Sequence, residues 1–418
     1  MAHHKDQLVS QQYEGYPYPA RNPADEKKRL IEGSPSDLAE IKHYLFGGGL
    51  PDTNGEPFRA LIAGGGTGDA AIMLAQQCAS AGLNAEITYL DLSTASRNIT
   101  EKRAAVRGLS NLHFVTGSLL DAPVLTPGPF DYIDCCGVLH HLEIPEEGLK
   151  QLVTVLKSSG GMGLMVYGEY GRRGVYEMQE ALRAFASASL PDAERIARTK
   201  RLLGRLPKTN WLRRNPFVQD HQTGGDAGIY DLLLHARDRA YRVAEFAAMV
   251  EGAGLEITRF ITPAAYEPVT YLNDPLLLNQ TNSLPLTERA AVAEALAGNL
   301  RKHVVYAAPL ARAQDAVAQP ENLDLIPKLH RQQPKPLSEA LRKGRLQVNM
   351  DGLDATFPAP PRAAAVTARF DGHRTLNEIM LEMIKSDPSL NQSHAEIIVK
   401  DVFHFLENLN LALLSTER

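Results

Sequence analysis

The chain has 418 residues, of which 44% are hydrophobic and 22% charged, and its formal net charge at pH 7 is −5. This length predicts two or three domains, and the composition is typical of a globular protein. The slightly acidic balance argues against a surface devoted to nucleic acid, so we expect no nucleic-acid partner.

The ends of the chain and its cysteines bear on where the protein works. The N-terminal segment lacks the apolar run of a signal peptide, and no run reaches the roughly 18 apolar residues of a membrane-spanning helix. The cysteines are Cys78, Cys135 and Cys136, an odd number with two adjacent in an apolar run. They predict reduced thiols in a cytoplasmic protein without a membrane partner. No Cys or His partners stand at ligand spacing, so we predict no metal site.

Strand-like and helix-like patterns alternate from residue 59 to residue 168. The strand-like runs are apolar almost throughout, which indicates a parallel sheet covered on both faces. Ser93 can cap one of the helices at its N-terminus, and Gly108 can end it. The predicted strands are 59–64, 85–92, 111–117, 130–139 and 160–168, and the predicted helices are 69–82, 93–108 and 144–158.

The alternation then lapses, and the remaining sequence sets the domain organisation that we predict. Residues 173–240 are charged and mostly helical, and we interpret them as an insertion. Their basic stretch, residues 195–214, has eight Lys or Arg residues and favours a solvated helix face over an RNA contact. A helix at 241–254 and strands at 255–262 and 300–309 complete the sheet. The predicted parts are an arm (1–54), an α/β domain (55–310), a linker (311–340) and a small C-terminal α+β domain (341–418).

Four glycines fall within residues 64–68, directly after the first predicted strand. A glycine turn between a strand and a helix lets a ligand approach the backbone, where the helix N-terminus offers free N–H groups. Asp91 ends the next strand, where a carboxylate can accept hydrogen bonds from ribose hydroxyls. Together they predict an adenosine-type cofactor. Gly66, Gly68 and Ala71 fit a dinucleotide pattern, whereas Gly64, Gly66 and Gly68 fit the G-x-G-x-G pattern of S-adenosylmethionine sites.

A set of consecutive motifs decides between these cofactors by resemblance. AGGGTGD, YLDLS, FVTGSLLD, FDYIDCCGVLHHL and GGMGLMVYG resemble, in this order, the motifs of class I S-adenosylmethionine-dependent methyltransferases. The resemblance covers about residues 55–170. It implies a Rossmann-like core, S-adenosylmethionine as cofactor and methyl transfer as the activity.

The resemblance also implies where the cofactor would lie. Asp91 would bind the ribose hydroxyls. One departure is Ile62, because many family members have an acid two residues before the first glycine; this chain therefore lacks that carboxylate near the cofactor's amino group. The remaining residues implied are Gly64, Gly66 and Gly68 along the methionine and ribose, Leu92, Ser118 and Leu119 around the adenine, and Cys136 and Gly137 near the methionine end.

The stretch QQYEGYPYPARNP resembles segments that precede the core in some of these enzymes. Such segments can fold over the cofactor and the acceptor. We expect Tyr13 and Tyr18, with Tyr16, to form an aromatic lid and to contact the cofactor. The alternative is an arm that packs on the surface only for stability.

Candidate catalytic residues follow the fourth and fifth strands, where the acceptor should lie. His140 and His141 follow the fourth strand, and either could remove a proton; the alternative is a helix cap or a wall of the cofactor site. Tyr167 and Glu169 follow the fifth strand. An aromatic ring there could hold an ammonium group, and Glu169 could neutralise it.

The acceptor class rests on weaker resemblances. Residues 231–255 and 300–309 resemble the methyltransferase regulatory region of bacterial protein-lysine methyltransferases, and residues 354–379 resemble winged-helix-like modules, some of which bind peptides. They favour N-methylation of a protein or peptide side chain, lysine first. The alternatives are a small-molecule acceptor, such as a secondary metabolite, and a S-adenosylmethionine-binding regulator without turnover. Whether the chain forms a homo-oligomer stays open.

Overall fold

The structure is a computed structural model, and it describes residue 9 and residues 11–418. The chain divides into two compact units. The first unit contains residues up to Asp37, Thr53–Ala253 and Gly298–Val304, and the second contains Leu38–Asp52, Gly254–Ala297 and Val305–Arg418. Among the described residues, no helix is both long and apolar enough to cross a membrane.

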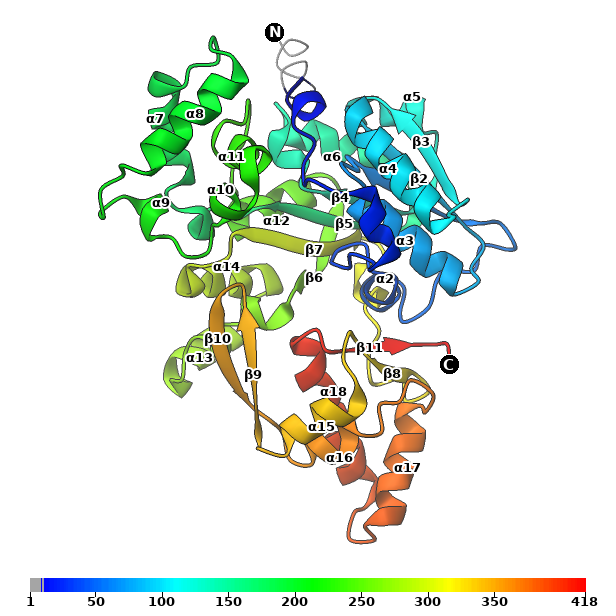
Figure 1. Ribbon diagram of the computed structural model, residues 1–418. Coiled ribbons are helices and arrows are strands. Elements are labelled where there is room, and N and C mark those ends of the chain that lie inside the picture. Colours follow the sequence, from blue (N-terminus) through cyan, green and yellow to red (C-terminus); the bar gives the residue numbers. More distant parts are fainter. Residues whose placement is uncertain (1–8, 10) are drawn as a thin grey trace. The chain divides into compact units, whose positions relative to one another are not determined.

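A seven-stranded sheet with the order β3-β2-β1-β4-β5-β7-β6 forms the centre of the fold (Figure 1). The ladders that join β3, β2, β1, β4 and β5 are parallel, as the apolar strands predicted, and the sheet as a whole is mixed. With its flanking helices it confirms the predicted Rossmann-like core. The strands are β1 (Phe58–Ala63), β2 (Ala85–Asp91), β3 (Leu112–Thr116), β4 (Phe130–Cys136), β5 (Leu156–Tyr167), β6 (Leu255–Ile261) and β7 (Lys302–Pro309).

The helices between these strands begin and end for local reasons that the sequence displays. The Ser93 hydroxyl accepts a hydrogen bond from the backbone N–H of Ser96, and Gly108 ends the same helix with a φ of 69°. The helices are α3 (Asp69–Ser80), α4 (Thr94–Arg107), α5 (Ala122–Leu125), α6 (Pro145–Thr154) and α12 (Val243–Gly252).

The predicted boundary between the helix 144–158 and the strand that follows it is wrong. We expected a helix from residue 144 to residue 158, but α6 ends at Thr154 and β5 already begins at Leu156. The run from Val153 to Val155 is β-branched, which disfavours helix, and Leu156 pairs with Phe130 of β4. Tertiary pairing therefore moves residues 156–158 into the sheet.

The strand order places a crevice where the cofactor is expected. Strand β1 lies between β2 and β4, so the connections from β1 and from β4 leave the carboxyl ends of adjacent strands in opposite directions along the sheet. Ligands of open α/β sheets bind at such a switch point. In this ladder Ile62 of β1 is paired with Asp134 of β4.

Residues 173–240 are mostly helical, as predicted, and belong to the first unit. Their apolar side chains form a core of their own, which includes Met178, Ile196 and Ile229. On the outer face, Arg198 and Lys200 of the basic stretch pair with Glu194 and Asp226. The helices are α7 (Val175–Phe185), α8 (Asp192–Leu203), α9 (Trp211–Arg214), α10 (Asp220–Thr223) and α11 (Gly225–Leu233).

The second unit has a buried polar centre. The Glu407 carboxylate of α18 lies 3.2 Å from His43 Nε2 and 2.9 Å from the Arg259 guanidinium. Residues 311–340, which we predicted as a linker, contain β8 and α15, and β8 pairs with β11. The predicted domain boundaries stay a prediction. The elements are α2 (Leu38–Leu45), α13 (Pro275–Asn282), α14 (Leu286–Ala297), β8 (Ile326–Leu329), α15 (Pro334–Leu341), β9 (Arg345–Met350), β10 (Leu353–Pro358), α16 (Ala363–Thr367), α17 (Leu376–Ser386), α18 (Gln392–Asn408) and β11 (Ala412–Ser415).

Candidate active site

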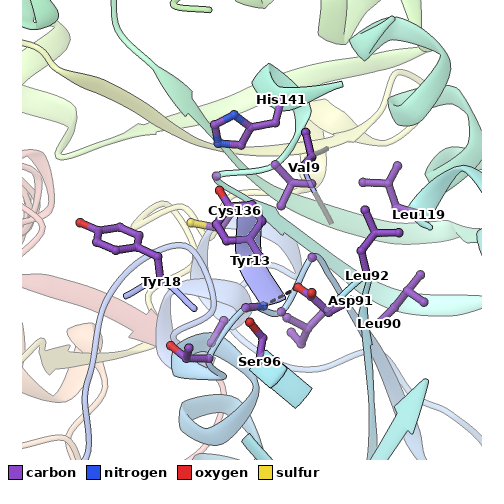
Figure 2. A pocket seen from close by; sticks show the side chains of 18 of the residues that line it. Val9, Tyr13, Tyr18, Leu90, Asp91, Leu92, Ser96, Leu119, Cys136 and His141 are labelled. Atoms are coloured by element: carbon purple, nitrogen blue, oxygen red, sulfur yellow. Dashed lines mark hydrogen bonds between the residues drawn. The ribbon is translucent and has the colours of Figure 1, made fainter. Parts of the chain in front are cut away.

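A cavity of about 300 Å³ opens at the carboxyl ends of the strands in the first unit. This volume is at the lower end of the range for small-molecule sites. Figure 2 shows Asp91, Leu92 and Leu119 toward one end of the cavity and Tyr18 toward the other. The predicted site residues that line it are Tyr13, Tyr18, Gly64, Gly66, Gly68, Asp91, Leu92, Ser118, Leu119, Cys136, Gly137, His141 and Tyr167.

The glycine turn is built for close approach. Gly64 has a φ of 79°, and a Cβ there would lie 2.2 Å from a methyl carbon of Val138. A Cβ on Gly65 would lie 2.3 Å from the Tyr89 ring. Only glycine fits these positions, so the backbone itself forms the wall of the cavity. This is the surface that an adenosine-type cofactor requires.

Asp91 is fixed in one orientation at the end of β2. Its carboxylate accepts hydrogen bonds from the backbone N–H of Gly66, at 2.7 Å, and of Ser93, at 2.8 Å. Burial raises the pKa of this carboxyl group, and the two hydrogen bonds oppose the effect. Asp91 thus joins the glycine turn to the second strand and lines the cavity, where ribose hydroxyls could donate to its remaining lone pairs.

The N-terminal arm is tied to the glycine turn. The Thr67 hydroxyl donates to the Pro19 carbonyl oxygen at 2.7 Å, and Arg21 forms an ion pair with Asp69 at 2.6 Å. Tyr18, which lines the cavity, donates its hydroxyl to Asp220 at 3.0 Å. The arm therefore closes one side of the cavity, as a lid would.

Arg103 of α4 anchors the same arm from below. Its side chain is 1% exposed and pairs with Glu26, of the 3-10 helix Pro23–Lys27, and with Asp69, each at 2.7 Å. It also donates to the Thr67 carbonyl oxygen at 2.6 Å. One buried guanidinium thus connects the arm, the glycine turn and α4.

The cavity wall also holds a carboxylate, Asp231, that we did not predict. It is 7% exposed and lines the cavity, and the Tyr13 hydroxyl donates to it at 3.2 Å. His235 Nδ1 accepts from the Arg237 backbone N–H, so its Nε2–H is free to donate to the Tyr13 oxygen, 3.2 Å away. Burial and the nearby Asp238 charge raise the pKa of Asp231 to about 7.

His141 and Tyr167 also line the cavity, His141 stacked on His235 and Tyr167 next to Asp231. His141 Nδ1 donates to the Arg237 carbonyl oxygen at 2.9 Å, which leaves Nε2 as an acceptor. Burial lowers the pKa of His141 and keeps the ring neutral. The Tyr167 hydroxyl lies 3.5 Å from Asp231, and the Arg172 guanidinium lies 3.6 Å from the centre of its ring.

Two predicted catalytic residues do not line the cavity. His140 packs against Tyr167, with ring centres 3.9 Å apart, and its two ring nitrogens have no hydrogen-bond partner among the described residues. The Glu169 carboxylate is 43% exposed and lies 3.8 Å from Arg242. The structure thus groups His141 and Tyr167 around the cavity and leaves His140 and Glu169 outside it.

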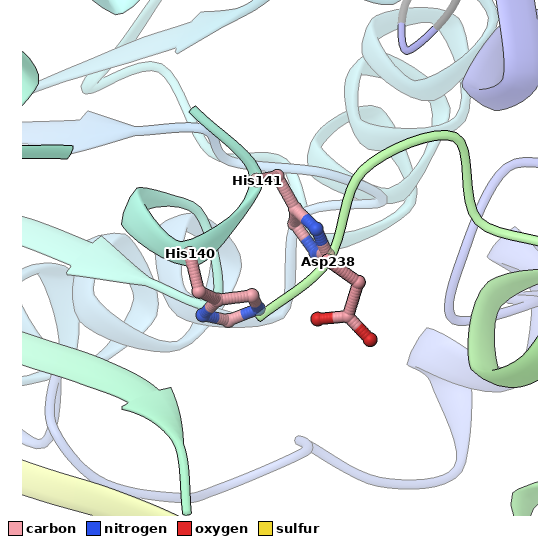
Figure 3. A group of neighbouring side chains, drawn as sticks. All are labelled: His140, His141 and Asp238. Atoms are coloured by element: carbon pink, nitrogen blue, oxygen red, sulfur yellow. The ribbon is translucent and has the colours of Figure 1, made fainter. Parts of the chain in front are cut away.

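His140, His141 and Asp238 form a cluster whose ligand atoms lie within 4.8 Å of one another (Figure 3). The Asp238 carboxylate accepts from Arg172 and from Gln179, each at 3.2 Å. A divalent cation would have to compete with the buried guanidinium for this carboxylate. We therefore assign no metal to the cluster.

Sequence reasoning missed Asp134 and Asp231, and for different reasons. Asp134 lies in the buried strand β4, which also holds Asp131, and is 2% exposed; an acidic residue in a predicted buried strand is a signal that the sequence displays. Asp231 lies in the helical segment, distant in sequence from every strand end. Only the packing of α11 brings it to the cavity.

Comparisons with known proteins agree with this geometry. Residues 61–162 match the family model described as a methyltransferase domain. An uncharacterized protein of Synechococcus sp. is 32% identical over 271 residues, which are 63% of this chain and 61% of the relative. The chain thus matches less than two thirds of that relative's length.

Solved structures of PKMT2 from Rickettsia typhi share the fold. One has a TM-score of 0.63 at 13% identity and covers 91% of this chain and 75% of that chain. The other, in complex with AdoHcy, has a TM-score of 0.62 at 14% identity and covers 96% and 76%. Residues 61–162 thus carry a methyltransferase domain, and the chain has the fold of S-adenosylmethionine-dependent methyltransferases, which supports S-adenosylmethionine as its cofactor.

Proposed function

We propose that this protein transfers the methyl group of S-adenosylmethionine to an amine on a protein or peptide side chain, with lysine as the first candidate. The observation that carries the proposal is Asp231, a buried carboxylate on the cavity wall beside two tyrosine rings. A carboxylate beside aromatic faces suits an ammonium group, which is attracted by both. Tyr13 and Tyr167 supply the rings.

These residues also fit the proton transfer that amine methylation needs. A lysine amine is protonated near neutral pH and has no free lone pair until it loses a proton. Asp231, with a pKa raised to about 7, can hold the ammonium group by charge and accept its proton. The nitrogen lone pair then forms a bond to the methyl carbon while the carbon–sulfur bond breaks. The electron pair of that bond stays on sulfur, which leaves S-adenosylhomocysteine.

A macromolecular acceptor is supported by the fold. The protein lysine methyltransferase PKMT2 matches nearly the whole described chain in fold, not only the methyltransferase core. The part of the chain beyond the core is then available for holding a large substrate. A small-molecule acceptor remains the competing reading, and the experiment below separates the two.

The test uses S-adenosylmethionine labelled at the methyl group. The purified protein is incubated with extract of its source cells, and macromolecules are separated from small molecules. We expect label in discrete protein bands, on lysine side chains by mass spectrometry. Label confined to the small-molecule fraction would overturn the proposal.

Two variants make the result specific to this cavity. Asp231→Asn should abolish most of the labelling while S-adenosylhomocysteine still binds, because the change lies at the acceptor end. Asp226→Asn is the matched control, since that exposed carboxylate of the same helix pairs with Lys200 on the surface. Equal labelling by the Asp231 and Asp226 variants would contradict the role of Asp231.

A further inference from the structure

We propose that Asp134 binds the α-amino group of the methionine part of S-adenosylmethionine. It would replace the acid that many family members have on the first strand, at the position where this chain has Ile62. The carboxylate is thus supplied by the neighbouring strand β4. This inference concerns the cofactor alone and does not depend on which acceptor is methylated.

The strand register places positions 62 and 134 side by side in the sheet. Ile62 and Asp134 are direct partners in the parallel ladder between β1 and β4, and both line the cavity. Paired residues of neighbouring strands project to the same face of a sheet. A carboxylate at position 134 therefore reaches the same region as one at position 62 would. Cys136 and Gly137, expected near the methionine end, follow two and three residues later.

The surroundings of Asp134 favour the binding of a cationic ligand. The side chain is 2% exposed, and the Ser36 hydroxyl donates to it at 2.7 Å. Among the described residues no Lys, Arg or His forms an ion pair with it. Burial raises the pKa of this carboxyl group to about 7, although hydrogen bonds from the Ser36 hydroxyl and the Cys136 backbone N–H oppose the effect. A buried carboxylate is costly unless a cation meets it, and the cofactor's ammonium group is one.

The other carboxylates on the cavity wall are committed elsewhere. Asp69 is paired with Arg21 and Arg103, and Asp91 lies at the end of β2, where the ribose hydroxyls are expected. Asp231 accepts from Tyr13 in the proposed acceptor region. Asp134 is thus the wall carboxylate that the cofactor's amine can take as its partner.

The experiment measures binding by calorimetry with two ligands, S-adenosylhomocysteine and its analogue in which hydrogen replaces the amino group. We expect the unaltered protein to bind the analogue roughly 10- to 100-fold more weakly, the value of a charge-assisted hydrogen bond. Asp134→Asn should lose a similar factor for S-adenosylhomocysteine and little for the analogue. Equal binding of both ligands by the unaltered protein would overturn the proposal, and this arm needs no variant.

Matched variants separate amine binding from general damage. Asp131→Asn makes the same change on the same buried strand, but Asp131 pairs with Lys157 and does not line the cavity, so the preference for the amine should persist. The double variant Ile62→Asp/Asp134→Ile moves the carboxylate from β4 to the paired position on β1. It should again bind S-adenosylhomocysteine more tightly than the analogue without the amino group. If Asp134→Asn weakens both ligands equally, the residue is only structural and the assignment fails.

Discussion

The Tyr13 hydroxyl donates a hydrogen bond of 3.2 Å to Asp231, although 218 residues separate the two in the sequence. The bond joins the N-terminal arm to α11 and places an aromatic ring beside the buried carboxylate. The arm is therefore part of the cavity wall. Removing this one hydroxyl should change the rate of methyl transfer and leave cofactor binding unchanged.

Tyr13→Phe keeps the ring and deletes the donor. A hydrogen bond to a carboxylate favours its charged form, so the pKa of Asp231 should rise in the variant. The acidic limb of the rate profile should shift to higher pH, and kcat should fall roughly 10-fold at pH 7. Steady-state rates from pH 6 to 9 would show this. An unchanged profile would mean that the bond is only structural.

Asp91→Ala should weaken S-adenosylhomocysteine binding by about 2 kcal/mol, or roughly 30-fold, because charge-assisted hydrogen bonds to the ribose are lost. Calorimetry measures this, with a thermal melt to confirm folding. Asp121→Ala is a control of the same residue type, since Asp121 does not line the cavity. A dissociation constant that stays constant in Asp91→Ala would refute the placement of the ribose.

Gly64→Ala should abolish cofactor binding and lower stability. Its new methyl group would meet Val138 at 2.2 Å, and the backbone has a φ of 79°. Gly82→Ala is matched, because Gly82 has a φ of 65° with nothing within 4 Å of the added carbon. The control should lose only about 1–2 kcal/mol to backbone strain and should bind S-adenosylhomocysteine normally. Similar binding by both variants would contradict the close approach of the ligand.

Arg103→Met should be strongly destabilising. The guanidinium is 1% exposed, and its loss leaves the 3% exposed Glu26 carboxylate with a weaker set of partners. Breaking a buried pair costs about 3–5 kcal/mol, whereas exposed pairs contribute about 0–1 kcal/mol. Arg198→Met, which breaks the half-exposed pair with Glu194, is the comparison. In urea unfolding, Arg103→Met should have a clearly lower midpoint than Arg198→Met. Equal midpoints would show that Arg103 does not anchor the arm.

The two buried carboxylates should make the ligand-free protein less stable as pH rises. Burial raises the pKa of Asp134 and of Asp231 to about 7, above the roughly 3.9 of an unfolded chain. The folded state then binds more protons between about pH 4 and 7, so the free energy of unfolding falls across this window. Each group accounts for up to about 4 kcal/mol, from three pKa units.

Asn variants test this dependence by denaturant unfolding. At pH 8, Asp134→Asn and Asp231→Asn should unfold at higher denaturant than the unaltered protein, and at pH 4 the difference should vanish. Asp131→Asn should instead unfold at lower denaturant than the unaltered protein at pH 8, because it breaks the ion pair with Lys157. A gain in stability that is the same at both pH values would exclude titration as its cause.

Sequence alone determined the core of this protein, because its signals are local. Strand β4 is buried almost throughout, and Ser93 and Gly108 cap α4. The glycines from Gly64 to Gly68 adopt backbone conformations, or fit spaces, that residues with a Cβ cannot. Each of these features depends only on residues nearby in the sequence, so it can be recognised without knowledge of the tertiary structure. They were enough to predict a parallel α/β sheet and an adenosine-type cofactor, whereas the Rossmann-like methyltransferase core and S-adenosylmethionine followed from the resemblance of the consecutive motifs.

The tertiary structure decided how residues distant in sequence meet. Asp231 and Tyr13 come together only through the packing of the arm and α11, and Asp134 stands beside Ile62 only through the pairing of β1 with β4. It also placed His141 on the cavity wall and Glu169 outside it, although both follow strands. Hydrogen bonds and burial between distant segments depend on the whole set of contacts, which no local pattern records.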